Sequence, residues 1–168
     1  MALSGNEVNE SRGEAPVAIT NCTVARTLVA LGEKWTFLIL RDAFRGARRF
    51  EEFLSQTAIP RQVLSNRLAA LTEQGILSKR MYREPGERAR AEYVLTEKGL
   101  DTFPIIAAIR QWGDRYEADA DGPPTEALHR DCAATVSVHL RCSEGHEVTS
   151  SKDIVHRLGP GARTRTEG

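Results

Sequence analysis

The chain has 168 residues, of which 40% are hydrophobic and 27% are charged, and its formal net charge is zero. This balance is typical of one compact globular domain with modest extensions, and it excludes a largely disordered chain. No apolar run approaches the roughly 18 residues that cross a bilayer, and residues 1–16 lack the apolar core of a signal peptide. Three cysteines, an odd number, argue against a disulfide framework. We therefore expect a cytoplasmic protein with no membrane partner.

The neutral total conceals a segregation of charge. Residues 41–95 carry 11 basic and 7 acidic side chains, whereas residues 96–131 carry 4 basic and 8 acidic ones. A basic central segment is typical of a local nucleic-acid footprint, although such blocks also arise by chance.

The first elements in chain order are predicted to be helical. Residues 1–20 are polar and aperiodic and predict a flexible arm. Asn21 is the expected N-cap of an amphipathic helix that Gly32 ends. Residues 33–44 are apolar nearly all round, which predicts the central helix of the core.

A helix-turn-helix pattern follows. Apolar residues at helical spacing predict a short helix over 49–56, and Pro60, which suits the first position of a helix, opens another that Gly75 ends. Only three residues separate the two helices, as in a helix-turn-helix.

A β-hairpin and a long helix complete the pattern. Residues 76–82 and 89–95 predict two strands, with Pro85-Gly86 suited to the turn between them. The last helix is expected to run from 97 to about 117, with a kink at Pro104. Alternating residues 135–140 predict one more short strand.

The predicted fold class is mainly α with a small β-hairpin: a winged helix-turn-helix that dimerises through its first and last helices and carries a short β-rich C-terminal extension. The expected boundaries are a flexible arm at 1–20, a DNA-binding domain at 21–118, a linker at 119–127, an extension at 128–158 and a flexible tail at 159–168.

One face of the second motif helix is suited to reading DNA. Leu64, Leu68 and Leu71 define its buried side, so the amides of Gln62 and Asn66 project almost opposite and can pair with adenine. The remaining candidate contacts flank this face, the start of the first motif helix and the hairpin: Arg48, Arg49, Arg61, Ser65, Arg67, Arg88 and Arg90. For Arg67 we weigh a phosphate contact against an intramolecular ion pair. For each arginine the alternative is an ordinary solvated surface residue.

The chain resembles the HxlR-type branch of MarR-like winged-helix transcription regulators over roughly residues 22–118. Ordered blocks carry the resemblance, among them Asn21-Cys22-Thr23-Val24, Leu31-Gly32-Glu33-Lys34-Trp35-Thr36, Gly46-Ala47-Arg48-Arg49-Phe50-Glu51-Glu52-Phe53, Val63-Leu64-Ser65-Asn66-Arg67-Leu68 and Tyr93-Val94-Leu95-Thr96-Glu97-Lys98-Gly99. One departure concerns the recognition helix, where the family usually has Ser-Pro and this chain has Pro60 one place earlier, followed by Arg61-Gln62. The operator sequence therefore cannot be predicted by analogy.

The resemblance implies a bacterial homodimeric DNA-binding regulator, most often a repressor, whose first and last helices form the dimer contact. Two-fold pairing would bury surplus apolar surface on those helices. It would also place two recognition helices about one DNA turn apart, so we expect a double-stranded, pseudo-palindromic operator.

Cys22 is the candidate redox switch. With Asn21 as the cap, Cys22 occupies the first helical position, where the helix dipole and nearby Arg26 favour the thiolate. The resemblance supports this role, because several HxlR-like regulators sense oxidants or electrophiles through a cysteine in this motif. The alternatives are a buried small hydrophobe, or control by a small ligand in the dimer interface near Trp35 and Trp112.

The C-terminal segment contains two pairs of metal-ligating residues. His129 and Cys132, with Cys142 and His146, could surround a tetrahedral Zn²⁺ ion, although the spacing is not that of a zinc knuckle. The alternatives are a Cys132–Cys142 redox pair or simple strand residues.

Two other classes of function are less well supported. A winged helix that binds protein would need an acidic or apolar recognition face, which Arg61, Gln62 and Asn66 do not provide. An enzyme is disfavoured because no catalytic triad, phosphate-binding glycine loop or carboxylate pair can be placed in the sequence.

Overall fold

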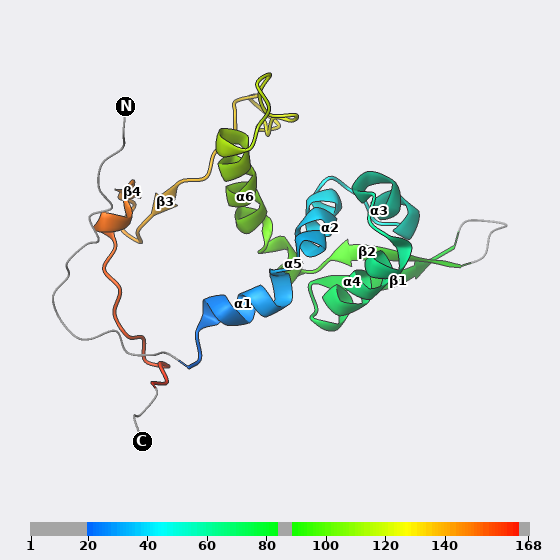
Figure 1. Cartoon of the computed structure of the whole chain (residues 1–168), viewed down its shortest axis with the longest axis horizontal. Coiled ribbons are helices and arrows are strands. Elements are labelled where there is room, and N and C mark those ends of the chain that lie inside the picture. The colour runs from blue at the N-terminus through cyan, green and yellow to red at the C-terminus, as the bar shows by residue number, and fades with distance from the viewer. Residues whose placement is uncertain (1–19, 84–88, 165–168) are drawn as a thin grey trace. The chain divides into compact units, whose positions relative to one another are not determined.

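A computed structural model describes residues 20–83 and 89–164 of the chain (Figure 1). The predicted arm up to residue 19, the Pro85-Gly86 turn, Arg88 and residues 165–168 of the predicted tail lie outside the described residues. The described chain divides into two compact units, one formed by residues 27–138 and the other by residues 20–26 with 139–164. The domain boundaries expected from the sequence remain predictions.

The larger unit has the predicted winged helix-turn-helix order, which confirms a mainly α fold with a small β-hairpin. Its elements are α1 (Thr23–Leu31, which begins in the smaller unit), α2 (Lys34–Phe44), α3 (Phe50–Thr57), α4 (Arg61–Glu73), β1 (Leu77–Tyr82), β2 (Arg90–Leu95), α5 (Glu97–Leu100) and α6 (Phe103–Tyr116). Figure 1 shows α2, α3 and α4 gathered beside the antiparallel hairpin of β1 and β2. None of the described helices is long and apolar enough to span a membrane.

The core lies where α2, α3 and α4 meet. Ile39 and Leu40 of α2, Phe53 of α3 and the predicted inward side of α4 are fully buried. Because Leu64, Leu68 and Leu71 all point into this core, the opposite face of α4 is fixed toward solvent.

The turn between α3 and α4 contains a non-glycine residue in the left-handed backbone region. Ala58 has a φ of 52°, in the left-handed region that L residues seldom occupy. The hydroxyl of the preceding Thr57 donates to the Phe53 carbonyl oxygen at 2.7 Å and accepts the Ile59 N–H at 3.3 Å. These bonds hold the three-residue connection that sets the angle between the motif helices.

A backbone contact ties the hairpin to the start of the motif. The Tyr93 N–H of β2 donates to the Arg48 carbonyl oxygen at 2.7 Å, and Arg49 forms a β-bridge with Glu92. Residues 48 and 49 thus extend the hairpin on one edge immediately before α3 begins.

Three local predictions were wrong. The helix expected over 97–117 is interrupted between α5 and α6, because Pro104 stands in the first turn of α6, where its missing N–H costs nothing.

Residues 135–140 do not form a continuous strand. Thr135 forms an isolated bridge with Leu128, and Leu140 begins β3 (Leu140–Arg141), which pairs with β4 (Glu147–Val148). Asn21 does not cap α1, since its side chain bonds instead to the backbone of Gly161 and Arg163.

The end of the hairpin is joined to α5 by a tight contact at Gly99. The Thr96 hydroxyl donates to the Gly75 carbonyl oxygen at 2.6 Å and accepts the Gly99 N–H at 3.1 Å. A Cβ atom added to Gly99 would collide with the Ile76 carbonyl oxygen. Only glycine therefore allows α5 to pack this closely against the base of the hairpin.

We predict that Gly99→Ala lowers the free energy of unfolding by about 1–3 kcal/mol, because the methyl group collides with rigid backbone. Gly113→Ala in α6 is the matched control: nothing lies within 4 Å of its added Cβ, so higher helix propensity should raise stability by about 0.5–1 kcal/mol. Urea unfolding of both variants tests this, and equal effects of the two substitutions would refute the close contact.

Candidate nucleic-acid interface

The solvent-facing side of α4 presents the predicted recognition residues together. Gln62, Ser65 and Asn66 are all exposed, and Gln62 Nε2 donates to Asn66 Oδ1 at 2.9 Å. This bond joins two amides one helical turn apart through the Gln62 amino group and the Asn66 carbonyl oxygen. The major-groove edge of adenine presents one acceptor and one donor, which a side-chain amide can match.

Arg61, at the start of α4, is held by the first motif helix. Its guanidinium forms a two-bond ion pair with Glu51 at 2.7 and 3.1 Å and lies 5.1 Å from the centre of the Phe50 ring. The paired hydrogen bonds lower the pKa of Glu51 and raise that of Arg61. The pair engages two of the five N–H donors, so a two-bond contact of the same Nη atoms with DNA would require exchange of this carboxylate for a phosphate or a base.

Arg67 adopts one of the two roles considered for it. Its Nη2 atom lies 3.3 Å from Glu33 Oε1 in an ion pair that bridges α4 and the residue before α2. The side chain is about one-third exposed, so the ion pair links the two elements, and a phosphate contact by Arg67 stays a prediction.

Arg48 and Arg49 flank the N-terminus of α3, where both are exposed. The Glu52 carboxylate accepts the backbone N–H groups of Arg48 at 2.8 Å and Arg49 at 2.9 Å, and these bonds lower the pKa of Glu52. The Arg49 guanidinium also lies 4.6 Å from the centre of the Tyr82 ring in β1. Both arginines are thereby positioned beside the hairpin.

The described part of the hairpin adds further basic residues. Lys79 and Arg80 are exposed on β1, and Arg90 pairs with Tyr82 in the strand register. Arg88 lies outside the described residues. The described candidates therefore come from three connected parts of one unit: the loop before α3, the exposed face of α4 and the hairpin.

Sequence reasoning missed the carboxylates that hold these arginines. The signal for Glu52 was available, because it stands three residues after Arg49 at a helix start, the position of a capping carboxylate. Glu51 had no such signal, since its partner Arg61 is ten residues away, across the turn of the motif.

The structure shifts Cys22 by one position relative to the prediction. The Cys22 carbonyl oxygen accepts the Arg26 N–H at 3.2 Å, and α1 begins at Thr23, so Cys22 is the residue just before the helix. Its side chain is exposed, not buried. The thiol is therefore accessible to a small oxidant.

The predicted metal ligands occur as two separate pairs. The Cys132 Sγ and His129 Nδ1 atoms are 3.4 Å apart, and the Cys142 Sγ and His146 Nδ1 atoms are 3.5 Å apart. Within residues 20–83 and 89–164, no group of three or more His, Cys, Asp or Glu side chains is arranged to hold a metal ion. Each pair offers two of the four ligands that structural zinc takes, and the zinc site stays a prediction.

The fold and this surface define a DNA-binding transcriptional regulator of the winged helix-turn-helix class. The model of the HxlR-like helix-turn-helix family matches residues 30–121, more than half of the chain, and the protein belongs to that family.

Similar proteins carry names of the same class. The HTH-type transcriptional regulator Rv3095 of Mycobacterium tuberculosis is 38% identical over 143 residues, which cover 85% of this chain and 89% of that protein. The crystal structure of PA1607, solved as a candidate transcription factor, has a TM-score of 0.73 at 35% identity and covers 83% of this chain and 96% of that one. The redox regulator HypR in its oxidised form has a TM-score of 0.51 at 31% identity and covers 55% and 94%. The names of these relatives indicate no catalytic family.

We predict that Glu52 stabilises the fold in a pH-dependent way. Its folded-state pKa lies below the ordinary value of 4.5, so its contribution is complete above that value and is lost as the pH falls through the lower, folded pKa. Glu52→Gln should therefore reduce stability at neutral pH and weaken the acid dependence. Urea unfolding across the acid range measures this, with exposed Glu144→Gln as the control; an unchanged acid slope in Glu52→Gln would contradict it.

Proposed function

We propose that this protein is a homodimeric, sequence-specific repressor that binds a pseudo-palindromic double-stranded DNA site and is released when Cys22 is oxidised or alkylated. The observation that carries the DNA-binding part is the exposed amide pair of Gln62 and Asn66, placed in one compact unit with the basic loop at Arg48 and the hairpin. In this arrangement α4 enters the major groove, and the loop and hairpin contact phosphates on either side.

The residues divide into those that specify the site and those that strengthen binding. Gln62, Ser65 and Asn66 have short polar groups that reach base edges. Arg48, Arg49 and Arg90 supply positive charge next to the backbone, and Arg88 is proposed to join them from the hairpin tip. Arg61 is proposed to strengthen DNA binding when its guanidinium exchanges the Glu51 carboxylate for an acceptor on DNA.

Dimer formation is supported by apolar surface on α1 and α6. Leu28 and Val29 of α1 are 57% and 84% exposed, and Trp112 of α6 is 58% exposed. Along α6, Ile105, Trp112 and Tyr116 recur at helical spacing and are all exposed. Large apolar side chains in such a row favour burial against a second copy.

For DNA binding, we predict that Asn66→Ala lowers affinity for the operator by about 1–3 kcal/mol while leaving affinity for a scrambled duplex nearly unchanged. Arg48→Gln should weaken binding to both duplexes and reduce the salt slope by about one, because one phosphate contact is lost. Fluorescence anisotropy on DNA from upstream of the gene and its neighbours provides the measurement, and binding stoichiometry reports two protomers per site.

The matched control for the charge change is Arg130→Gln, which removes an exposed arginine from the segment after α6. It should leave both affinities unchanged. If no native segment outcompetes the scrambled duplex, the protein is not a sequence-specific regulator.

Redox control is proposed from the exposure of Cys22 at the start of a helix with an exposed apolar face. A relative of known structure, HypR, is a redox regulator. Diamide removes two electrons and two protons from two thiols, so Cys22 would form a disulfide with a second thiol, either of the other protomer or of a small molecule. A bulky group there would disturb α1 and the pairing of the two protomers.

We predict that diamide lowers the operator affinity of the wild-type protein at least tenfold and that Cys22→Ser abolishes this response. Cys132→Ser and Cys142→Ser remove the other exposed thiols and should respond like the wild type. Anisotropy before and after diamide, followed by reduction, gives the result. A response that survives Cys22→Ser would assign any switch to another residue.

A further inference from the structure

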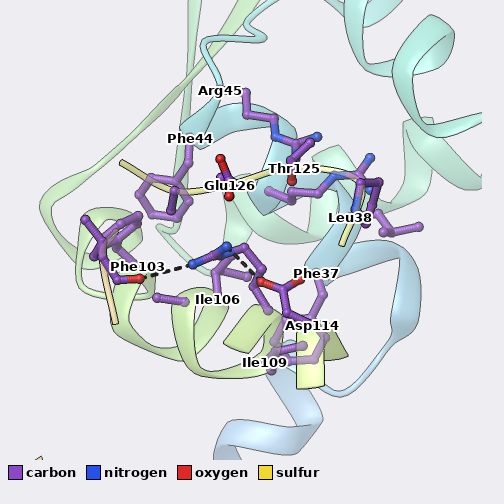
Figure 2. A pocket seen from close by; sticks show the side chains of 16 residues that line it. Phe37, Leu38, Phe44, Arg45, Phe103, Ile106, Ile109, Asp114, Thr125 and Glu126 are labelled. Carbon is purple, nitrogen blue, oxygen red and sulfur yellow. Dashed lines mark hydrogen bonds and ion pairs between the residues drawn. The ribbon is translucent and has the colours of Figure 1, made fainter. Parts of the chain in front are cut away.

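A cavity of about 600 Å³ lies within the larger unit, between α2, α6 and the segment that follows α6 (Figure 2). This volume falls within the range of small-molecule sites, roughly 300–1,000 Å³. Neither Trp35 nor Trp112, the residues around which a ligand was considered from the sequence, lines it. The cavity is therefore a different place from the one that the sequence suggested.

The remaining wall of the cavity comes from a segment beyond the family match, residues 122–136, called the added segment below. The family match ends at residue 121, whereas Thr125, Ala127 and Val136 lie beyond it and line the cavity. The Val136 N–H donates to the Ala127 carbonyl oxygen at 2.8 Å, and Arg110 of α6 donates to the Val136 carbonyl oxygen at 3.3 Å. The first bond closes the added segment on itself, and the second fastens it to α6.

Most of the interior surface is apolar and aromatic. Phe44 of α2 and Phe103 of α6 have ring centres 5.2 Å apart at an edge-to-face angle of 63°. Phe37, Ile106 and Ile109 line the cavity as well, and Figure 2 shows Phe37 and Ile109 across it from Phe44. A flat apolar group of ligand size would be in contact with rings on two sides.

The three arginines around the cavity differ in how closely an acidic side chain pairs with them. Arg41 forms two bonds with buried Asp42, at 2.8 and 3.0 Å, and Arg110 pairs with Asp114 at 2.8 Å. Arg45 has only long contacts, 3.9 Å from Nη1 to Asp42 Oδ1 and 3.4 Å from Nη2 to Thr125 Oγ1. Its fork of five N–H donors thus retains capacity for a planar anion.

Glu126 is the carboxylate on the cavity lining that a bound anion has to avoid. Figure 2 shows it between Phe44 and Thr125, and among the described residues it forms no ion pair, with Arg45 or with any other cation. Glu126 is exposed and belongs to the added segment, so it can turn toward solvent and leave Arg45 to a ligand carboxylate.

We propose that this cavity binds a small amphipathic carboxylate, with its apolar body among the phenylalanine rings and its carboxylate on Arg45. The site is made of the family fold and the added segment together. It goes beyond the proposed function, and its binding test requires no DNA.

The test is a fluorescence titration of the full-length protein with pyrenebutyrate and with pyrenebutanol, which share the apolar body and differ in the carboxylate. We expect the acid to bind about tenfold to a hundredfold more tightly than the alcohol, the gain from a charged hydrogen bond. Arg45→Gln should remove that difference, Arg45→Lys should retain part of it, and Glu126→Gln should strengthen binding of the acid.

Two further variants localise the binding. Ala127→Trp fills the cavity and should abolish binding of both probes, while Arg130→Gln, outside the cavity, should change nothing. Circular dichroism checks that each variant folds. Equal affinity for acid and alcohol, or unaltered binding in Ala127→Trp, would overturn the proposal.

Sedimentation separates this site from a protein contact. If Ala127→Trp changes the oligomeric state, the cavity is covered by a second copy of the chain, and the ligand proposal falls.

Discussion

The DNA-facing surface depends on the backbone pairing between residues 48–49 and β2. The Arg48 carbonyl oxygen and the Tyr93 N–H are 2.7 Å apart, and this bond precedes α3 by two residues. One short segment therefore sets the hairpin relative to the first motif helix, and the turn at Ala58 then sets the second helix relative to the first. The first link is a backbone hydrogen bond, and the second is a backbone angle held by the short, buried Thr57 hydroxyl. The spacing between the hairpin and α4 therefore does not depend on long, flexible side chains.

The order of the elements could be predicted from the sequence because each one has a local signal. Apolar spacing, Pro60 and the glycines at 46 and 75 mark the helices, and both glycines have the positive φ expected after a helix. The inward side of α4 follows from three leucines at helical spacing. The same local signals failed at two places. The Asn21 side chain does not cap α1 because it bonds to Gly161, 140 residues away. At Pro104 the sequence predicted a kink within a helix, whereas a new helix begins there.

The site could be predicted only in part, for a related reason. Residue type and helix periodicity bring Gln62 and Asn66 to one exposed face. They do not show which arginines are already paired, because Glu51 and Glu33 reach Arg61 and Arg67 through the tertiary fold. The cavity was invisible in the sequence, since its walls come from segments on both sides of the motif and meet only after folding.

The ion pair between Arg61 and Glu51 bears on how the protein would choose among DNA sites. In the free protein this guanidinium already has two good acceptor bonds. If Arg61 reads DNA as proposed, it exchanges this planar, charged acceptor for one on DNA, so only the difference between the two pairings adds to affinity. Glu51 would then be an internal competitor that reduces the contribution of Arg61 at every site and suppresses it where the DNA offers a weaker acceptor.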